Sequence, residues 1–399
     1  MRTIIEKKVY EIAESICDYI QNSSFKVSGG LYSGDYGILL FLYYLAQYTG
    51  DKKYEILSSE YADKLLKEIG NTVNDHTFGE GLSGILYLFD FLKSKDFVEV
   101  DLKDYEELLN NRMLKMMRHD FLDGNYDFMH GALGVPFYLF RKKGYENALM
   151  ELIDYLYSSA IVDSMSNGIK WISKIETKGI LCYNLSLSHG ISSILAVLAL
   201  SYGSIVSLHY KGKCLALIDQ LVNYLLSQEI DYQVNKAFFP SVIDIKDKKT
   251  TTFCSRLAWC YGDLGLAASL YIAGKAINNL QYKQKANSIL ISRFNEKSIS
   301  ECGVFDAGFC HGSIGIASVA RRMYLQTNNR TFLDTYNYWT KVSLDLATHN
   351  SLSAGYKTYM GKYWTDDYSL LTGISGIGLA YISFLSNDNQ DWDELFLLS

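Results

Sequence analysis

The sequence contains very little proline: Pro136 and Pro240 are the only two among 399 residues, whereas average usage is about 5%. Because proline interrupts helices, its scarcity permits long, uninterrupted helices. An excess of basic residues is also missing, since 38 Lys and Arg stand against 44 Asp and Glu, a formal net charge of −6. This acidic balance argues against nucleic acid as the main partner.

Export and membrane-spanning signals are missing as well. Charged residues begin at Arg2 and continue at Glu6, too early for the apolar core of a signal peptide. Residues 191–208 carry no formal charge, but serines and a glycine interrupt them, which favours a buried helix over a membrane helix. The 7 cysteines are odd in number, which favours reduced thiols. We therefore expect a cytoplasmic protein that reaches the membrane only peripherally, through partners.

A glycine phrase repeats along the chain: Gly, two residues, Gly, then an apolar run. The first glycines are 47, 50, 59, 72, 50 and 61 residues apart, with long intervals before the fifth and seventh phrases. In the fourth phrase the second glycine is replaced by Ser193. The seven phrases begin at Gly34, Gly81, Gly131, Gly190, Gly262, Gly312 and Gly373.

The segments around each phrase predict two kinds of helix. The run after each phrase is apolar on nearly every face, which indicates a helix buried all round. Segments such as 52–69 and 104–117 are charged and amphipathic, as expected of helices with one solvent-exposed face. Seven such pairs could form an open solenoid or a closed two-layered barrel. Closure is favoured because the inner runs are almost purely apolar, so we predict one all-α domain spanning residues 1–399.

Cysteine and histidine stand directly before two consecutive repeat glycines. Cys260 lies two residues before Gly262, and Cys310 and His311 immediately precede Gly312. Two thiolates and an imidazole suit Zn²⁺, and three protein ligands leave a fourth position open, as in catalytic zinc sites. Ordinary buried cysteines are the alternative, but the equivalent placement favours one zinc ion per chain. The other cysteines are interpreted as structural: Cys17, Cys182, Cys214, Cys254 and Cys302.

Residues beside other glycines are candidates for acid–base chemistry. His189 precedes Gly190 as His311 precedes Gly312, and an ordinary pKa near 6.5 suits a general acid or base. Asp127 could orient His189 or carry a second proton; a plain cap of the following turn is the alternative.

Residues flanking Cys260 could serve the chemistry or the loop. Arg256 and Tyr261 could stabilise a developing oxyanion, or brace the metal loop instead. Trp259 is expected in the core, and His130 is a candidate only for lining the cavity. The aromatic stretch 356–364 could line the cavity mouth or form a packed loop.

These segments resemble the lanthionine synthetase C-like (LanC-like) cyclases over nearly the whole chain. The resemblance rests on the seven phrases and on Ser188-His189-Gly190, Arg256-Leu-Ala-Trp-Cys260-Tyr261-Gly262 and Cys310-His311-Gly312. It implies an α/α toroid of seven inner and seven outer helices. It also implies zinc at Cys260, Cys310 and His311, with His189, Asp127, Arg256 and Tyr261 taking part in the chemistry.

The resemblance further implies a stand-alone lantibiotic cyclase. Its substrate would be a leader-bearing ribosomal precursor peptide whose Ser and Thr have been dehydrated, and its partners a dehydratase and a membrane transporter complex. Cysteine thiols would add to dehydroalanine or dehydrobutyrine and form thioether rings. A zinc prenyltransferase would need a basic pyrophosphate-binding wall, which these loops lack. A relative that binds glutathione, adds it to dehydroamino acids, or only binds peptides is the remaining alternative.

Overall fold

The computed structural model describes residues 1–22, 27–69, 73, 75–99, 103–177, 180–246, 250–251, 256–295, 299, 301–386 and 390–399. Each glycine phrase leads into a buried α-helix, as predicted from its apolar run. Within the described chain these helices are α2 (Asp35–Thr49), α4 (Leu82–Ser94), α6 (Gly134–Leu139), α8 (Ile191–Ser201), α11 (Asp263–Ala276), α13 (Ser313–Thr327) and α15 (Ile374–Leu385).

A second set of helices buries one face and exposes the other. In α14, for example, Phe332, Thr335, Tyr336 and Trp339 are buried at helical spacing. The segment predicted at 52–69 forms α3, which ends at Glu68, and the segment predicted at 104–117 belongs to a longer helix, α5. The described helices of this set are α1 (Arg2–Asn22), α3 (Lys52–Glu68), α5 (Lys103–Asp123), α7 (Glu146–Ser159), α9 (Leu208–Ser227), α12 (Leu280–Phe294) and α14 (Arg330–Asp345).

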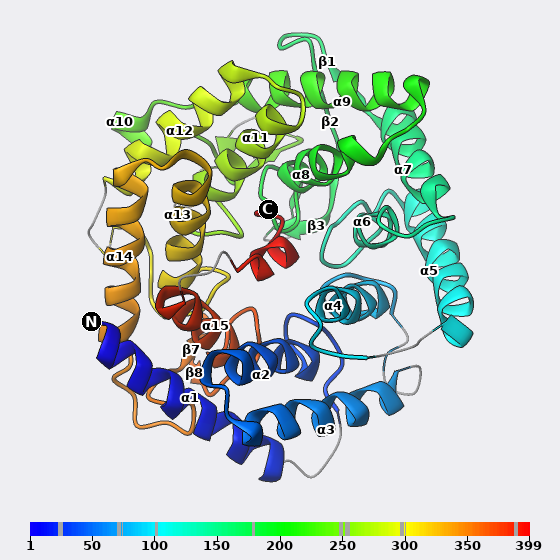
Figure 1. Ribbon diagram of the computed structural model, residues 1–399. Coiled ribbons are helices and arrows are strands. Elements are labelled where there is room, and N and C mark those ends of the chain that lie inside the picture. The colour runs from blue at the N-terminus through cyan, green and yellow to red at the C-terminus, as the bar shows by residue number, and fades with distance from the viewer. Residues whose placement is uncertain are drawn as a thin grey trace. The chain divides into compact units, whose positions relative to one another are not determined.

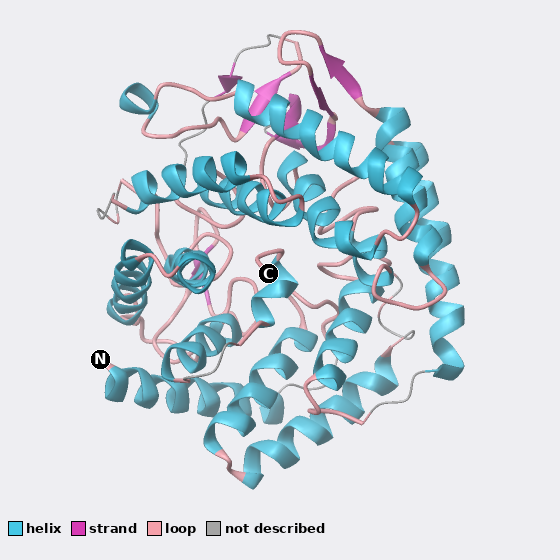
Figure 2. Cartoon of the chain, turned by 45° about the horizontal axis from the view of Figure 1, so that its top comes forward, coloured by secondary structure: helices cyan, strands magenta, loops and turns pink. Residues whose placement is uncertain are grey.

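Short strands occupy the longer intervals between phrases, and helices dominate the rest of the described chain (Figure 2). The strand pairs within the described residues are antiparallel, and they form a β1–β2 hairpin, a β3-β4-β5-β6 sheet and a β7–β8 hairpin. The remaining elements are β1 (Ile161–Asp163), β2 (Gly168–Lys170), β3 (Ser173–Thr177), β4 (Ile180–Asn184), β5 (Val242–Asp244), β6 (Thr250–Thr251), β7 (Thr358–Tyr359), β8 (Trp364–Thr365), α10 (Tyr232–Asn235), η1 (Tyr202–Ser204) and η2 (Trp392–Phe396).

The glycines of the phrase are required by close packing. A Cβ on Gly312 would lie 2.5 Å from Oδ1 of Asp306, and a Cβ on Gly315 would lie 1.9 Å from the carbonyl oxygen of Phe309. Both distances are too short for a carbon atom. The first glycine therefore lets the preceding loop pack closely against it, and the second lets the first turn of the helix pack against that loop. Ser193 replaces the second glycine of the fourth phrase, and its Oγ donates to the carbonyl of Gly190 at 2.6 Å.

The described chain divides into two compact units. Unit 1 comprises Met1–Asp75, Gly79–Asp104 and Val304–Trp392. Within it, α2 packs against α3 and α15, α15 packs against α1, and α13 packs against α14 (Figure 1). The backbone N–H of Leu371 donates to the carbonyl of Tyr32 at 2.9 Å, so the seventh phrase lies beside the first. This neighbourhood is expected when a repeat series closes, and it is absent from an open solenoid.

Unit 2 comprises His76–Phe78, Tyr105–Gly303 and Asp393–Ser399. Within it, α8 packs against α9 and α11, α11 against α12, and α7 against α6 and α9 (Figure 1). Strand β4 pairs with β5 through the register Tyr183↔Ile243 and Asn184↔Val242. This pairing matters for the site because Asn184 begins the loop that carries His189.

The uncharged stretch 191–208 forms a short buried helix rather than a long apolar one. Helix α8 ends at Ser201. Its serines are satisfied internally: Ser192 Oγ donates to the carbonyl of Leu185 at 2.6 Å, and Ser201 Oγ to that of Val197 at 2.7 Å. Across the described residues, no helix combines the length and apolar character that crossing a membrane requires.

Candidate functional site

A short polar turn shapes most of the loops that precede the glycines. Asn or Asp stands six positions before the first glycine in five repeats. In four of them its Oδ1 accepts the backbone N–H two residues on. The loop therefore folds back on itself and presents the last two residues before the glycine. These bonds are Asn125 to Asp127 at 3.4 Å, Asn184 to Ser186 at 2.9 Å, Asp306 to Gly308 at 3.1 Å and Asp367 to Ser369 at 2.8 Å.

The fifth loop, which carries Cys260, is built differently. Arg256 takes the place of the Asn or Asp, and Gly262 has φ +97°, a conformation that only glycine adopts without strain. The carbonyl of buried Cys260 accepts the backbone N–H groups of Leu187 at 3.1 Å and Ser188 at 3.3 Å. The neighbouring loop therefore holds the backbone of Cys260 in place.

Cys310 and His311 are held by contacts within unit 1. The backbone N–H of Cys310 donates to the carbonyl of Leu371 at 2.9 Å. Nε2 of His311 lies 3.7 Å from Oδ2 of Asp306, a carboxylate whose side chain is 2% exposed. That carboxylate is itself fixed, because it accepts the backbone N–H groups of Gly308 and Tyr359, the latter at 3.0 Å. With Nε2 facing Asp306, His311 can present Nδ1 to a metal ion.

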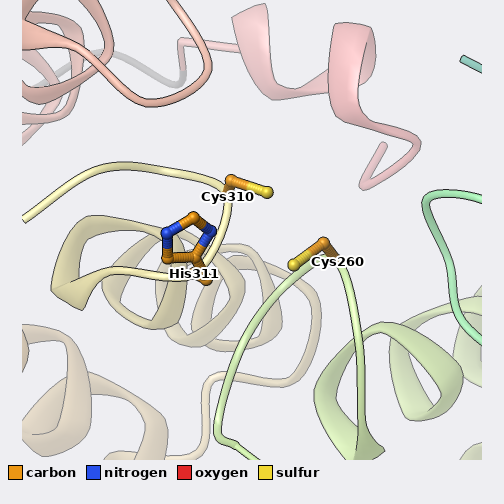
Figure 3. Close-up of side chains that lie close together, drawn as sticks. All are labelled: Cys260, Cys310 and His311. Carbon is orange, nitrogen blue, oxygen red and sulfur yellow. The ribbon is translucent and has the colours of Figure 1, made fainter. Parts of the chain in front are cut away.

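The three predicted metal ligands are close together. The ligand atoms of Cys260, Cys310 and His311 all lie within 4.8 Å of one another (Figure 3). Two sulfur atoms and one imidazole nitrogen form a donor set that fits Zn²⁺ and leaves one tetrahedral position for another ligand. The donor set in the structure therefore fits the zinc ion expected from the sequence.

His189 and Asp127 form a hydrogen-bonded pair within unit 2. Nδ1 of His189 lies 2.9 Å from Oδ2 of Asp127, and the other carboxylate oxygen accepts the backbone N–H of His130 at 2.7 Å. The Asp127 side chain is 4% exposed and that of His189 is 17% exposed. The carboxylate thus holds the imidazole by Nδ1 and leaves Nε2 for proton exchange.

The pKa of His189 is raised above its ordinary value. Burial alone would lower this pKa, but the hydrogen bond that Nδ1 donates to Asp127, the charge of Asp127 and the charge of Cys260 together outweigh burial. The protonated imidazole is therefore favoured, which suits a residue that stores a proton for later delivery.

Tyr261 stands beside the pair. Its hydroxyl accepts a hydrogen bond from Nδ2 of Asn184 at 3.3 Å, and its ring centroid is 6.0 Å from that of His189. Burial, followed by the charges of Cys260 and Asp127, raises the pKa of Tyr261 to about 12, although hydrogen bonds from Asn184 and Ser186 lower it. The phenol is thus protonated at neutral pH and can donate a hydrogen bond.

The other residues singled out from the sequence have different surroundings. Arg256 is exposed, and among the described residues the structure records no hydrogen bond or ion pair for its guanidinium. The structure therefore does not join Arg256 to the pair, and its role stays a prediction. The ring of His130 stacks on that of His189 with centroids 5.4 Å apart. Trp259 is fully buried, as predicted, and its Nε1 donates to the carbonyl of Phe396 at 2.9 Å.

The sequence reasoning missed Asp306 and Asn184. Both occupy the position six residues before a repeat glycine, where Asn or Asp recurs in the aligned phrases, and that recurrence could have identified them. The described cysteines outside the candidate site are buried: Cys17, Cys182, Cys214 and Cys302. Cys254 lies outside the described residues.

Comparisons with known proteins indicate the family and the fold of this chain. The family model for lanthionine synthetase C-like proteins matches residues 26–397. "Nisin biosynthesis protein NisC" from Lactococcus lactis subsp. lactis is 22% identical over 338 residues, covering 75% of this chain and 74% of that protein. The solved structure of "Nisin cyclase" has a TM-score of 0.78 with 19% identity, covering 97% of this chain and 96% of that chain. The fold is therefore the predicted all-α, α/α toroid fold of that cyclase.

Proposed function

Since the family match covers most of its length, the chain belongs to the lanthionine synthetase C-like family, and we propose that it is a zinc-dependent lantibiotic cyclase. Its substrate is a dehydrated precursor peptide that bears a leader. Its reaction is the intramolecular addition of a cysteine thiol to dehydroalanine or dehydrobutyrine, which closes a thioether ring. The cyclase role is supported by the likeness to the nisin biosynthesis protein NisC and to the solved structure of nisin cyclase.

One observation carries the proposal: the ligand atoms of Cys260, Cys310 and His311 lie within 4.8 Å of one another. Three protein ligands are typical of catalytic zinc, since the remaining coordination position is left for substrate. When bound there, zinc lowers the pKa of a cysteine thiol from its free value of about 8.5 and so supplies a thiolate nucleophile. Asp306 orients His311 for this task through the contact with Nε2.

The acid–base work falls to His189 and Asp127. In the addition, a sulfur–carbon bond forms at the β-carbon of the dehydro residue, and the α-carbon gains a proton. Asp127 holds the imidazole by Nδ1 at 2.9 Å, so Nε2 is the atom that carries and delivers this proton. Because the pKa of His189 is raised, the imidazolium is available as the acid.

Charge that develops on the substrate needs stabilisation by donors. Loss of the double bond places negative charge on the carbonyl oxygen of the dehydro residue, as an enolate. The protonated phenol of Tyr261 can donate a hydrogen bond to such an oxygen. We assign Arg256 a supporting positive charge, supplied when the exposed side chain turns toward bound peptide.

Thiol alkylation tests the reaction directly. The protein is incubated with zinc and a dehydrated, cysteine-containing precursor, and remaining thiols are then alkylated and counted by mass spectrometry. Cyclisation leaves the peptide mass unchanged and removes alkylatable thiols. A mass increase by one glutathione, when glutathione is added, indicates intermolecular addition instead. Unchanged thiols with every dehydrated precursor would leave only a binding role.

Substitutions assign the residues within this assay. Cys310→Ala should lose zinc and cyclisation together. The control is Cys214→Ala, at a buried cysteine whose thiol donates a hydrogen bond to the carbonyl of Leu198, and this variant should keep zinc. His189→Ala should keep zinc and lose cyclisation. Full zinc stoichiometry in Cys310→Ala would contradict the ligand set, and normal turnover in His189→Ala would remove His189 from the mechanism.

The proposed reaction also defines partners. The substrate requires an enzyme that dehydrates Ser and Thr, so we propose a dehydratase as the preceding partner, in the cytoplasm. A transporter that exports the finished peptide would bring the cyclase to the membrane surface peripherally.

A further inference from the structure

The β7–β8 hairpin and Phe305 expose large apolar side chains on unit 1. Phe305, Met360 and Tyr363 are 52%, 53% and 62% exposed, and Trp364 is 40% exposed. These four side chains are called the hairpin surface below. Single exposed apolar residues are ordinary, but several aromatic ones grouped together indicate a site of interaction.

Ring contacts join two members of the hairpin surface, Phe305 and Trp364, through the ring of Tyr359. The ring of Tyr359 lies 4.9 Å from that of Phe305 and 5.1 Å from that of Trp364, measured between centroids. The ring of Trp364 in turn lies 4.7 Å from that of His349. Phe305 is far from the hairpin in sequence, so the fold itself assembles this array.

The backbone beneath the hairpin surface is well supported. Tyr359 pairs with Trp364 across the hairpin, and the N–H of Met360 donates to the carbonyl of Tyr363 at 2.9 Å. Oγ1 of Thr358 donates to the carbonyl of Thr372, in the seventh glycine loop, at 2.9 Å. Rings held in this way lose little conformational entropy when they bind a partner.

The backbone that carries the hairpin surface is linked to the loop of Cys310 and His311 through Asp306. Oδ2 of Asp306 accepts the backbone N–H of Tyr359 at 3.0 Å, and the same oxygen lies 3.7 Å from Nε2 of His311. Phe305 is the residue next to Asp306 in sequence. A peptide whose cysteine reaches Cys310 and His311 therefore has the hairpin surface within a few residues of its reacting sulfur.

We propose that the hairpin surface binds apolar side chains flanking the reacting cysteine of the precursor peptide. This inference rests on the proposed cyclase function and specifies which peptide segments that site accepts. Aromatic side chains provide large contact areas with few rotatable bonds, and they recur where proteins bind peptides tightly. A second copy of this chain is the competing occupant, but the contact with the His311 loop favours substrate.

The test compares variants and two dehydrated peptides. Trp364→Ala removes a ring of the array, and Tyr363→Ala removes a side chain at the hairpin tip. Tyr10→Ala, at a tyrosine of α1 that is 41% exposed, is the matched control. One peptide has Leu or Ile on both sides of the cysteine, and the other has Gly or Ser there. Initial rates of thiol loss give kcat and KM for each combination.

With the apolar peptide, Trp364→Ala and Tyr363→Ala should each raise KM by roughly tenfold, the loss expected for one buried aromatic contact. Their kcat should be close to that of wild type, and the Tyr10→Ala variant should match wild type throughout. With the Gly or Ser peptide, all four proteins should have similar KM values.

Three results would overturn the inference. Unchanged KM in both variants, while wild type cyclises the peptide, rejects the hairpin surface and leaves the cyclase function intact. An equal rise in KM for both peptides indicates a general disturbance of the site. A wild-type dimer that the two variants convert to monomer, seen by light scattering, assigns the surface to a second copy. Absence of cyclisation by wild type would instead reject the proposed function itself.

Discussion

At the scale of single residues, the His189–Asp127 pair makes a prediction about pH. Asp127→Asn removes the carboxylate charge, so burial should dominate and the pKa of His189 should fall. NMR titration of the His189 imidazole in wild type and in the variant measures this directly. The upper pH limit of cyclisation should fall as well, because the imidazolium would be lost at lower pH. An unchanged His189 titration in the variant would show that Asp127 does not set its pKa.

The His189–Asp127 pair also makes the folding stability depend on pH. The folded pKa of His189 is raised, so folding favours the protonated form. The resulting stabilisation is complete below the unfolded pKa of about 6.5 and disappears as pH rises through the folded value. The charge on His189 should therefore contribute to the difference in free energy of unfolding between wild type and Asp127→Asn at low pH and not at high pH. Denaturant unfolding at a series of pH values measures this difference.

Asp306 is expected to act through His311 on zinc affinity. A carboxylate that orients a metal-binding imidazole typically contributes a factor of about 10 to 100 in metal affinity. Asp306→Asn should weaken zinc binding by that factor, measured by competition with a chromogenic chelator. Asp367→Asn is the matched control, because Asp367 forms the same turn to Ser369 in the seventh loop. Equal losses in both variants would mean that loop shape, and not the contact with His311, controls affinity.

At the scale of secondary-structure elements, much of the fold followed from the sequence. The apolar runs predicted the buried helices because their residues leave no face for solvent. The residues before the glycines predicted which side chains meet, since equivalent loops of a repeat occupy equivalent positions. The aromatic stretch 356–364 is compatible with a cavity mouth or with a packed loop, because aromatic composition alone does not distinguish exposed rings from buried ones.

Other features of the elements depend on contacts that single residues do not reveal. The turn formed by Asp306 could have been found from the repeat, but its contact with Tyr359 requires the β7–β8 hairpin, distant in sequence. The distances that a Cβ would make at the phrase glycines show that close packing accounts for most of the phrases. At Gly262, with φ +97°, glycine is required by the backbone conformation.

Gly262 therefore makes a prediction for its loop. Gly262→Ala should destabilise the fold by about 1–3 kcal/mol, because an L-residue is strained at this φ. Zinc affinity should fall too, because Cys260 lies two residues away. In contrast, Gly212→Ala within α9, where a Cβ meets nothing within 4 Å, should stabilise by about 0.5–1 kcal/mol. Urea unfolding compares them, and a neutral Gly262→Ala would contradict the strain argument.

At the scale of the whole molecule, we propose that residues 1–399 behave as a single domain. Units 1 and 2 are each assembled from three separate segments, so the chain passes from one to the other several times. No single cut of the chain would release a fragment that contains a complete unit. Under this proposal, thermal unfolding should occur in one cooperative transition.

Zinc provides a way to test that cooperativity. A ligand that binds only the folded state at a hundred times its Kd adds about 2.7 kcal/mol of stability. Calorimetry with added zinc should move the entire transition to higher temperature, and chelation should move it back. The Cys310→Ala protein should show one transition that zinc does not shift. Two transitions in wild type, of which zinc moves only one, would mean that the chain unfolds as two domains.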